Sequence, residues 1–551
     1  MTKPVLSIQN LEVEAQLPDE NRRLIDHVSF DLNEGEILGL VGESGSGKSL
    51  LCRSIVRLLP SSILKISAGS VILDGNDLVH ASEAEMLGVR GGKIGMIFQN
   101  PTSHLDPVMS VGDQIAEGIR FHKGLAKAKA KVAAVEMMVQ VGFTDPQRQY
   151  GSFPHEFSGG MRQRAMIAVA LACDPEILIA DEPTTALDVT IQAQILQLLM
   201  QLRDQRGLSI ILITHDLGVV AQTCDRIAVM RNGKLLEQGL KQDVLRHPRD
   251  PYTRNLIASH PSMPEAASLH SVIVPGQAPL LQVNDLHVRY PVAGGFLKSR
   301  TMSALKGVSL EVRAGETIGI VGESGSGKST LARAILGLAP IAEGSITFDG
   351  LTLSADRKEA LRALRRDAAM VFQDPFNSLN PRMTIGDTLA EVLRVQGKID
   401  VKDIPERIIQ LLDLVGLDRS FATRKPRSLS GGQCQRAGIA RALAVDPKII
   451  IADECIAALD VTIQAQIVEL FRELKSKMQL TLLFIAHDLA VVRNLCERVV
   501  VMYHGEIVEE GLSVDVFAHP KQAYTAALIG AIPDIDPTKS LFEERVLADA
   551  S

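Results

Sequence analysis

The sequence predicts an α/β protein made of two consecutive copies of one domain, each organised around a parallel β-sheet. The stretch VGESGSGKS ends at Ser49 and returns ending at Ser329. Later features such as His215 and His487 recur with nearly the same offset. Within each copy, apolar strand-like runs alternate with helix-like segments. That alternation predicts a doubly wound sheet that binds ligands at the carboxyl ends of its strands.

The repeat also sets the expected domain limits. We expect a first domain at residues 1–260, a linker at 261–279 and a second domain at 280–551. The linker stretch is rich in Pro, Ser and Ala, as flexible connections are. The period is far too long for a solenoid, so each copy should be a complete domain.

The composition argues against several classes of protein function. The 551 residues are 46% hydrophobic with a net charge of −7, which argues against nucleic acid as the main partner because phosphate contacts need clustered Lys and Arg. Six cysteines are scattered without a C-x-x-C pair, as expected for reduced thiols. The N-terminus lacks a secretory apolar region, and no apolar run approaches the roughly 20 residues that span a bilayer. We therefore expect a soluble chain that meets a membrane through partner proteins alone.

The elements of the first copy follow in order. The alternating runs LSIQNLEVEA and LIDHVSFDL predict antiparallel strands. Residues 36–41 predict a buried strand before the glycine-rich loop, and MIFQNP a strand that ends at Gln99. Helical periodicity over residues 101–157 predicts a helical insert. Residues 176–180 and LSIILITHD predict buried parallel strands, ending at Asp181 and at His215.

The glycine-rich stretches fit the phosphate-loop spacing G-x-x-x-x-G-K-[ST]. Glycines let the backbone wrap an anion without Cβ clashes, and the following helix N-terminus points N–H groups at it. The lysine reaches the β- and γ-phosphates, and the serine hydroxyl binds Mg²⁺. The nucleotide-binding residues of these loops are Gly42, Ser44, Gly45, Gly47, Lys48 and Ser49, and Gly322, Ser324, Gly325, Gly327, Lys328, Ser329 and Thr330.

Acidic pairs follow a buried strand in each copy. Asp181 and Asp453 end apolar strands, where a carboxylate can hold Mg²⁺ through water. Glu182 and Glu454 come next, where a carboxylate can orient and polarise the water that attacks the γ-phosphate. A solvated acidic turn is the alternative, which the phosphate loops upstream disfavour.

An amide and an imidazole complete each predicted site. Gln99 and Gln373 each follow a Phe at a strand end, where an amide can ligate Mg²⁺ and sense the attacking water. His215 and His487 each precede an Asp after an apolar strand; their agreement between copies favours a catalytic over a structural role. The sequence thus predicts ATP and Mg²⁺ as cofactors, with Ser49, Gln99, Asp181, Ser329, Gln373 and Asp453 as metal ligands.

With LSGGQ at Leu429–Gln433 and FSGGM at Phe157–Met161, the chain resembles ABC-transporter ATPases over nearly its whole length. The resemblance implies two tandem P-loop ABC ATPase domains, each with a RecA-like parallel-sheet core, an antiparallel β subdomain and a helical subdomain. It also implies that the halves pair head to tail around two ATP molecules, each held by the phosphate loop of one half and the SGG turn of the other.

The resemblance assigns residues to two composite sites. Glu182, His215, Glu454 and His487 would be catalytic, and Asp188 and Asp460 would link the sites. Because both glutamates are present, we expect two competent sites. The SGG turns would contribute Ser158, Gly159 and Gly160 to one site, and Ser430, Gly431, Gly432 and Gln433 to the other.

Three departures from the family pattern stand out. Tyr290 occupies the position where the family stacks an aromatic ring on adenine, whereas the first copy has Ala15, so we expect weaker stacking at the first site. Met161 replaces the Gln of LSGGQ, a change that we expect to be tolerated. The second copy reads DECIAALD where the first reads DEPTTALD, so we expect a looser turn there.

HPRDPYTRNLI near Tyr252 and HPKQAYTAALI near Tyr524 resemble the oligopeptide/dipeptide importer branch of this family, in a fused form like the glutathione and microcin C or peptide import ATPases. The resemblance implies two transmembrane permeases and a periplasmic solute-binding protein as partners, at the cytoplasmic face of the inner membrane. Peptide, glutathione, opine and nickel-chelate cargoes all remain open. We expect no iron–sulfur cluster, because no cysteine follows Cys496.

Three other functions deserve comparison. A double-ATPase translation factor would carry a long charged linker and often lacks the histidine. A DNA-repair ATPase would insert zinc modules or coiled coils, and neither pattern appears. The two glutamates argue against a scaffold that binds ATP without turnover.

Overall fold

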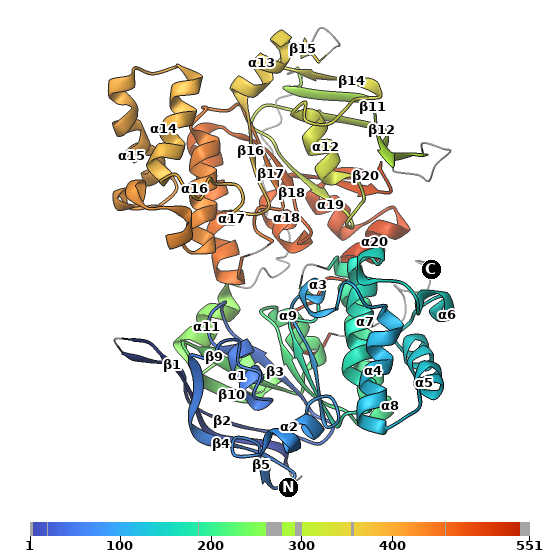
Figure 1. Ribbon diagram of the computed structural model, residues 1–551. Coiled ribbons are helices and arrows are strands. Elements are labelled where there is room, and N and C mark those ends of the chain that lie inside the picture. The colour runs from blue at the N-terminus through green and yellow to red at the C-terminus, as the bar shows by residue number, and fades with distance from the viewer. Residues whose placement is uncertain are drawn as a thin grey trace. The chain divides into compact units, whose positions relative to one another are not determined.

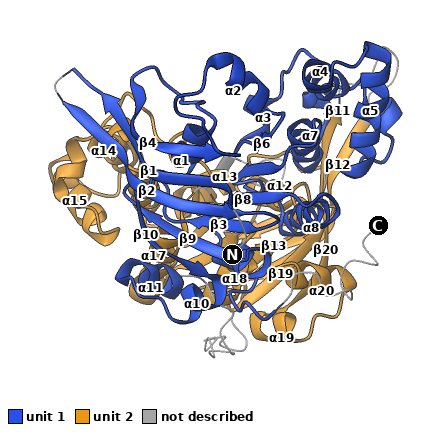
Figure 2. Cartoon of the chain, turned by 90° about the horizontal axis from the view of Figure 1, so that it is seen from below, with its two compact units in different colours: residues 1–260, 533–543 blue, residues 261–532, 544–551 orange. Residues whose placement is uncertain are grey.

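The computed structural model describes residues 4–18, 20–185, 187–259, 278–292, 300–353, 358–457 and 459–539. The chain divides into two compact units (Figures 1 and 2). Unit 1 comprises Met1–His260 and Pro533–Glu543, and unit 2 comprises Pro261–Ile532 and Glu544–Ser551. The expected linker lies almost wholly outside the described residues.

Unit 1 contains two sheets. The first is antiparallel, with the order β2-β1-β4-β5, as the alternating N-terminal runs predicted. The second has the order β10-β9-β3-β8-β7-β6 and is parallel except for the pair β9–β10. The strands are β1 Pro4–Gln16, β2 Asn21–Asn33, β3 Ile37–Val41, β4 Leu64–Leu73, β5 Asn76–Asp77, β6 Ile94–Ile97, β7 Ile177–Asp181, β8 Ser209–Ile213, β9 Arg226–Arg231 and β10 Lys234–Leu240.

The expected helical insert of unit 1 is confirmed, since helices occupy most of the segment between β6 and β7. In Figure 1 the helices α4 (Val111–Lys123) and α5 (Lys127–Gln140) lie beside α7 (Gly159–Leu171). The remaining helices are α1 Lys48–Ile55, α2 Glu83–Val89, α3 Pro101–His104, α6 Pro146–Gln149, α8 Val189–Arg206, α9 Leu217–Thr223, α10 Lys241–Arg246 and α11 Pro251–Ala258, with a 3₁₀ turn at Pro154–Glu156.

Unit 2 repeats this plan. Its sheets have the orders β12-β11-β14-β15 and β16-β17-β18-β13-β19-β20. The strands are β11 Leu281–Val292, β12 Arg300–Val312, β13 Thr317–Val321, β14 Glu343–Phe348, β15 Leu351–Thr352, β16 Ala368–Val371, β17 Ile449–Asp453, β18 Thr481–Ile485, β19 Arg498–Tyr503 and β20 Glu506–Leu512. The helices are α12 Lys328–Ile335, α13 Lys358–Asp367, α14 Ile385–Gln396, α15 Ile404–Leu414, α16 Gly431–Leu443, α17 Val461–Met478, α18 Leu489–Leu495, α19 Ser513–Ala518 and α20 Ala523–Gly530, with 3₁₀ turns at Val401–Asp403, Arg419–Thr423 and Pro426–Ser428.

The parallel strands are buried from end to end because they read as continuous Ile, Leu, Val and Ala runs. Every residue of β3, β7 and β8 is buried, and so is every residue of β13, β17 and β18. This pattern is typical of a sheet covered on both faces. In unit 1, one apolar cluster joins the antiparallel sheet to the parallel one through Leu51, Cys52 and Ile55 of α1. The helix that follows the glycine-rich loop is therefore fixed on both sides.

Two strands end earlier than the sequence predicted. Strand β6 stops at Ile97, so Gln99 stands two residues beyond it, and His215 likewise stands two residues beyond β8. Both side chains lie in the loops that leave the carboxyl edge of the sheet. Among the residues that the structure describes, no helix has the length and apolar character needed to cross a bilayer.

Candidate functional site

The glycine-rich loops run from β3 into α1 and from β13 into α12. Gly42 has φ 150°, and a Cβ there would lie 2.2 Å from the carbonyl oxygen of Met230. Gly47, with φ 103°, is the residue before α1. Gly322 and Gly327 repeat these conformations, with φ 144° and 107°. All four positions need glycine for their backbone conformation, and Gly42 and Gly322 need it also because they approach the carbonyl oxygens of Met230 in β9 and Met502 in β19.

Each loop surrounds the ammonium group of its lysine. Lys48 is 5% exposed, and its Nζ donates to the carbonyl oxygens of Gly42 and Glu43 at 2.7 and 2.9 Å. Lys328 makes the same bonds to Gly322 and Glu323, at 2.7 and 2.8 Å. The positive charge is therefore held within the loop at the N-terminus of a helix, an arrangement suited to a phosphate group.

The loop serine and the strand aspartate form the next contact. Ser49 Oγ donates to Asp181 Oδ1 at 2.8 Å, and Ser329 Oγ donates to Asp453 Oδ1 at 3.0 Å. Burial raises the pKa of Asp181 and of Asp453, in part offset by the serine hydrogen bond. Asp181 Oδ2 is also buried without a hydrogen-bond partner among the described residues. A hydroxyl beside a carboxylate oxygen that lacks a donor fits the oxygen-ligand preference of Mg²⁺.

Glu182 lies at the centre of the unit 1 site. Its Oε2 accepts hydrogen bonds from Gln99 Nε2 at 2.7 Å and from Thr185 Oγ1 at 2.8 Å. Its Oε1 lies 3.4 Å from Nδ1 of His215. Burial alone would raise the pKa of Glu182, but the partners His215, Thr185 and Lys48 together lower it to about 2. The carboxylate is therefore held ionised, and the pKa of His215 is raised by Glu182 against the lowering effect of burial.

Glu454 has a similar but smaller set of partners in unit 2. Gln373 Nε2 donates to Glu454 Oε2 at 2.6 Å, and His487 Nε2 lies 2.7 Å from the same oxygen. Burial opposes ionisation here as well, but His487 and Lys328 lower the pKa of Glu454. The residue equivalent to Thr185 is Ala457, which has no hydroxyl to donate.

Both glutamates have an unusual backbone. Glu182 and Glu454 each have φ 48°, in the left-handed region that residues with a side chain seldom adopt. Such conformations cluster at functional sites, because the surrounding structure must hold them. Each glutamate N–H donates to the last residue of the strand before the histidine, at Ile213 O (3.0 Å) and Ile485 O (2.9 Å). In both units, a hydrogen bond to the neighbouring strand thus holds the glutamate in its strained backbone conformation.

The SGG turns begin helices. Ser158 Oγ accepts from the backbone N–H of Met161 at 3.4 Å, at the start of α7. Ser430 caps α16 in the same way, and Gln433 returns a bond to the Ser430 N–H at 3.0 Å. Met161 cannot make that return bond. Asp188 and Asp460 are the N-cap residues of α8 and α17. Among the described residues, no hydrogen bond joins an SGG turn to the phosphate loop of its own unit.

The two expected base-stacking positions differ in their neighbours. Ala15 is 6% exposed and pairs across the sheet with Arg22, whereas Tyr290 is half-buried and pairs with Met302. Facing residues on neighbouring antiparallel strands share one face of the sheet. Unit 1 therefore presents a methyl group and a cation where unit 2 presents a phenol ring and a thioether.

Sequence reasoning missed three residues of the sites. Thr185 was passed over because a threonine in DEPTTALD gives no local signal of its contact with Glu182. Tyr252 and Tyr524 belong to the HP…YT segments, but nothing in their spacing indicates the phosphate loop. Each tyrosine oxygen accepts a hydrogen bond at 3.0 Å from a loop N–H, that of Glu43 or Glu323.

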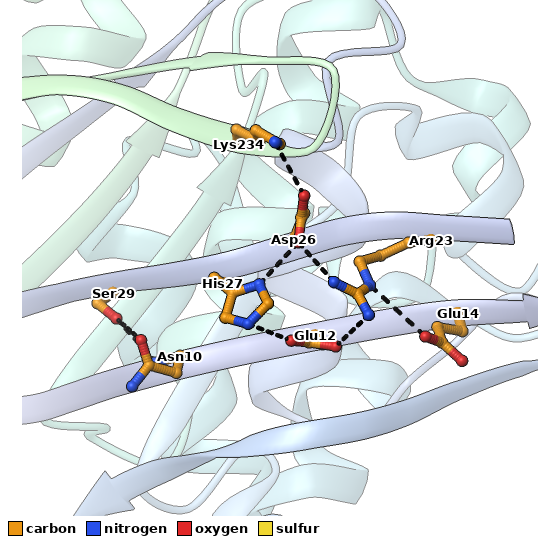
Figure 3. Close-up of polar contacts among 8 residues, drawn as sticks. All are labelled: Asn10, Glu12, Glu14, Arg23, Asp26, His27, Ser29 and Lys234. Carbon is orange, nitrogen blue, oxygen red and sulfur yellow. Dashed lines mark hydrogen bonds and ion pairs between the residues drawn. The ribbon is translucent and has the colours of Figure 1, made fainter.

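A second polar cluster lies on the antiparallel sheet of unit 1, and Figure 3 shows it. His27 contacts Glu12 through Nε2 and Asp26 through Nδ1, both at 2.7 Å. Arg23 reaches Glu12 at 3.2 Å and Asp26 at 2.9 Å, and Lys234 reaches Asp26 at 3.1 Å. Because Arg23 and Lys234 already pair with the carboxylates, the cluster is an ion-pair network that ties β1 and β2 to β10.

Comparison with known proteins accounts for this geometry. The model of the ABC transporter family matches residues 25–185 and 305–457, and that of the oligopeptide/dipeptide transporter C-terminal region matches 236–286 and 508–548. The chain is 42% identical to the peptidoglycan transport ATP-binding protein YejF of Agrobacterium fabrum, over 98% of each chain. It is equally 42% identical to the glutathione import ATP-binding protein GsiA of Shigella flexneri and of Escherichia coli, over 99% of this chain and 92% of each relative. The chain therefore belongs to the ABC transporter family. It is an ATPase with two fused nucleotide-binding domains, and its hydrolysis of ATP powers transport.

Proposed function

We propose that this chain powers the import of peptides or related small solutes, by closing its two halves around two ATP molecules and reopening them after hydrolysis. The observation that carries the proposal is the arrangement at Glu182. Its backbone is strained, and its ionised carboxylate is held by Gln99 and His215. Because Glu454 repeats this arrangement with Gln373 and His487, we propose two hydrolysing sites.

Each residue of the unit 1 site has a proposed role in ATP hydrolysis. Lys48 and the loop N–H groups bind the β- and γ-phosphates, and Ser49 with Asp181 would hold Mg²⁺, which neutralises phosphate charge. Glu182 orients the attacking water and accepts its proton as the water oxygen bonds to the γ-phosphorus and ADP departs. His215 donates toward the γ-phosphate, which develops charge at that stage. In unit 2 these roles fall to Lys328, Ser329, Asp453, Glu454 and His487.

The second wall of each site would come from the opposite half. Ser430, Gly431 and Gly432 would contact the γ-phosphate of the ATP that unit 1 holds, and Ser158, Gly159 and Gly160 that of unit 2. The start of a helix favours an anion through its free N–H groups and its dipole. Because these donors gain a partner only when ATP is present, nucleotide binding favours the closed form.

Two transmembrane permeases and a periplasmic solute-binding protein are the proposed partners, which places the chain at the cytoplasmic face of the membrane. The names of the relatives above refer to peptidoglycan transport and to glutathione import, which supports a small peptide-like cargo. The helical segments around α4, α5, α14 and α15, near Gln99 and Gln373 in sequence, are the proposed contact with the permeases.

Purification in mild detergent from the native cell tests this proposal. The full chain should bring down two multi-span membrane proteins at equal stoichiometry, and its ATPase rate should rise when they and the loaded binding protein are present in lipid vesicles. Recovery of ribosomal particles or DNA in place of membrane proteins would favour the translation-factor or DNA-repair alternative.

A further inference from the structure

The HP…YT segments reach back to the phosphate loops. In unit 1, Tyr252 is the second residue of α11, and its Oη accepts a hydrogen bond from the N–H of Glu43 at 3.0 Å. In unit 2, the equivalent Tyr524 of α20 accepts from the N–H of Glu323, also at 3.0 Å. Each bond joins residues about 200 positions apart in the chain, with separations of 209 and 201.

The peptide group that donates to the tyrosine also holds the lysine. The N–H of Glu43 and the carbonyl of Gly42 belong to one planar peptide, and that carbonyl oxygen accepts from Lys48 Nζ at 2.7 Å. In unit 2, the carbonyl of Gly322 accepts from Lys328 Nζ at 2.7 Å. Because a peptide plane turns as a unit, fixing its N–H fixes the direction of its carbonyl.

This peptide needs an external support. It follows Gly42, whose φ of 150° lies in a region where glycine meets little steric resistance. The hydroxyl of Tyr252 supplies the support from outside the loop. The same pair of bonds, with matching lengths, occurs at Gly322 and Tyr524, although the two halves differ in many surrounding residues.

Each tyrosine is itself anchored. Glu237 of β10 accepts from the N–H groups of Arg249 and Asp250 at 2.8 and 3.1 Å, and Asp250 accepts from the N–H of Tyr252 at 2.7 Å. The Tyr252 ring is 6% exposed and lies under the guanidinium of Arg231, 4.6 Å from the ring centre. The hydroxyl is therefore presented to the loop by a fixed ring.

Unit 2 keeps the glutamate of this anchor, but Gln522 stands where unit 1 has Asp250 and makes no side-chain cap hydrogen bond to α20. Glu509 accepts from the N–H groups of Lys521 and Gln522 at 2.8 and 3.1 Å. The ring of Tyr524 packs on Tyr503, with ring centres 4.3 Å apart, where unit 1 has the cation of Arg231. The partner of the ring thus changes between the halves, whereas the bond from the hydroxyl to the loop is kept.

We propose that Tyr252 and Tyr524 are positioning residues, which set the phosphate-binding lysines through the peptide planes Gly42–Glu43 and Gly322–Glu323. The inference rests on the proposed role of Lys48 and Lys328 in binding ATP. Both tyrosines lie in the segments that match the oligopeptide/dipeptide transporter C-terminal region, so this region would help to position the phosphate-binding lysine in each nucleotide site. Through the chain Glu237–Asp250–Tyr252, the segment after β10 acts on the affinity for ATP.

A Tyr→Phe change isolates the hydroxyl, because it keeps the ring and its packing. We would measure ATP binding by calorimetry on the full chain in the Lys328→Ala, Glu182→Gln background, which leaves one non-hydrolysing site in unit 1. Tyr252→Phe should raise the Kd for ATP about tenfold, since it removes the hydroxyl that holds the Gly42–Glu43 peptide plane and with it the carbonyl that positions Lys48.

A double-mutant cycle separates positioning from folding. If Tyr252 acts through Lys48, then Tyr252→Phe should raise the Kd less than twofold when Lys48→Ala is already present. In unit 2, measured in the Lys48→Ala, Glu454→Gln background, Tyr524→Phe should raise the Kd about tenfold. The matched control is Tyr503→Phe, which should leave the Kd unchanged within twofold because its ring stacks beside Tyr524 without a bond to the loop.

Two results would overturn the inference: an unchanged Kd in Tyr252→Phe, or an equal loss of affinity with and without Lys48, which would indicate a general effect on the fold. A different result bears on the proposed sites themselves. If the variant lacking both Lys48 and Lys328 bound ATP as tightly as the parent chain, the phosphate-loop assignment would fail whatever the tyrosines do.

Discussion

Thr185 donates a 2.8 Å hydrogen bond to the carboxylate of Glu182, and the equivalent Ala457 cannot donate one to Glu454. The two sites therefore share a fold and the same proposed catalytic residue types but differ in how firmly the glutamate is held. Among the described residues, Gln99, Thr185 and His215 contact the carboxylate of Glu182, whereas Gln373 and His487 contact that of Glu454.

The first prediction concerns this difference. Thr185→Ala should lower the ATPase rate of the unit 1 site by about fivefold, because the loss of a hydrogen bond worth about 1 kcal/mol frees the glutamate to move. The steady-state rate of the whole chain should fall by a smaller factor, because unit 2 still hydrolyses ATP. Ala457→Thr, the matched change at the other site, should not lower the rate. An equal loss in both variants would indicate that the turn is sensitive to any substitution and that the bond has no special part.

A second prediction concerns pH. The pKa of His215 is raised from 6.5, so its pairing stabilises the fold fully below about pH 6.5 and fades as pH rises through the folded value. The pKa of Glu182 is lowered from 4.5 to about 2, so the stability that its ionised carboxylate contributes to the fold is present above pH 4.5 and is lost as pH falls toward 2. The pair is therefore strongest between about pH 4.5 and 6.5.

NMR titration of His215 measures this coupling directly. In Glu182→Gln the midpoint of the histidine should move to lower pH, because the neutral amide no longer favours the imidazolium. The difference in melting temperature between the parent and this variant should shrink above the parent midpoint. A histidine midpoint that stays in place would show that Glu182 does not pair with His215 in solution.

A third prediction concerns the base-stacking position. In the Lys328→Ala, Glu182→Gln background, Ala15→Tyr should tighten ATP binding at the first site by roughly fivefold or more, because stacking on a base is worth about 1–3 kcal/mol. Affinity for inorganic tripolyphosphate, which has no base, is the control and should not change. Equal gains for both ligands would place the new ring away from the adenine.

The fourth prediction concerns the SGG turn of unit 1. Met161→Gln should complete the capping box that Ser430 and Gln433 form in unit 2, and should raise the free energy of unfolding of unit 1 by about 0.5–1 kcal/mol. Gln433→Met should cost a similar amount in unit 2. Urea unfolding followed by a probe in each unit measures both. A loss of stability in Met161→Gln would contradict the capping argument.

Much of each half could be read from the sequence because its signals are local. Continuous apolar runs marked β7 and β17, and the spacing from Gly42 to Ser49 marked a loop whose conformation follows from its glycines. Other contacts are tertiary and leave no trace in spacing. The bond from Tyr252 to Glu43 and that from Thr185 to Glu182 depend on how distant or turn-forming segments pack, so sequence reasoning reached the motifs but not their partners.

The left-handed backbone of Glu182 and Glu454 also could not be predicted from the sequence. No propensity predicts φ 48° for a glutamate, because the conformation is imposed by the hydrogen bonds of its N–H to the adjacent strand at Ile213 and Ile485. The position of these two acids directly after a buried strand could be predicted from the apolar run before them. Their strain could be seen only once the neighbouring strand was in place.

The central claim is that ATP held by the phosphate loop of one half is completed by the SGG turn of the other. The most direct test is an experimental structure of the Glu182→Gln, Glu454→Gln variant with Mg²⁺ and ATP, a variant that should retain both nucleotides while hydrolysing neither. We predict that Ser430 Oγ lies within hydrogen-bond distance, about 3 Å, of the γ-phosphate bound by Lys48, and Ser158 Oγ of that bound by Lys328. Two intact ATP molecules each enclosed within a single unit, with both serines far from the phosphates, would contradict the account.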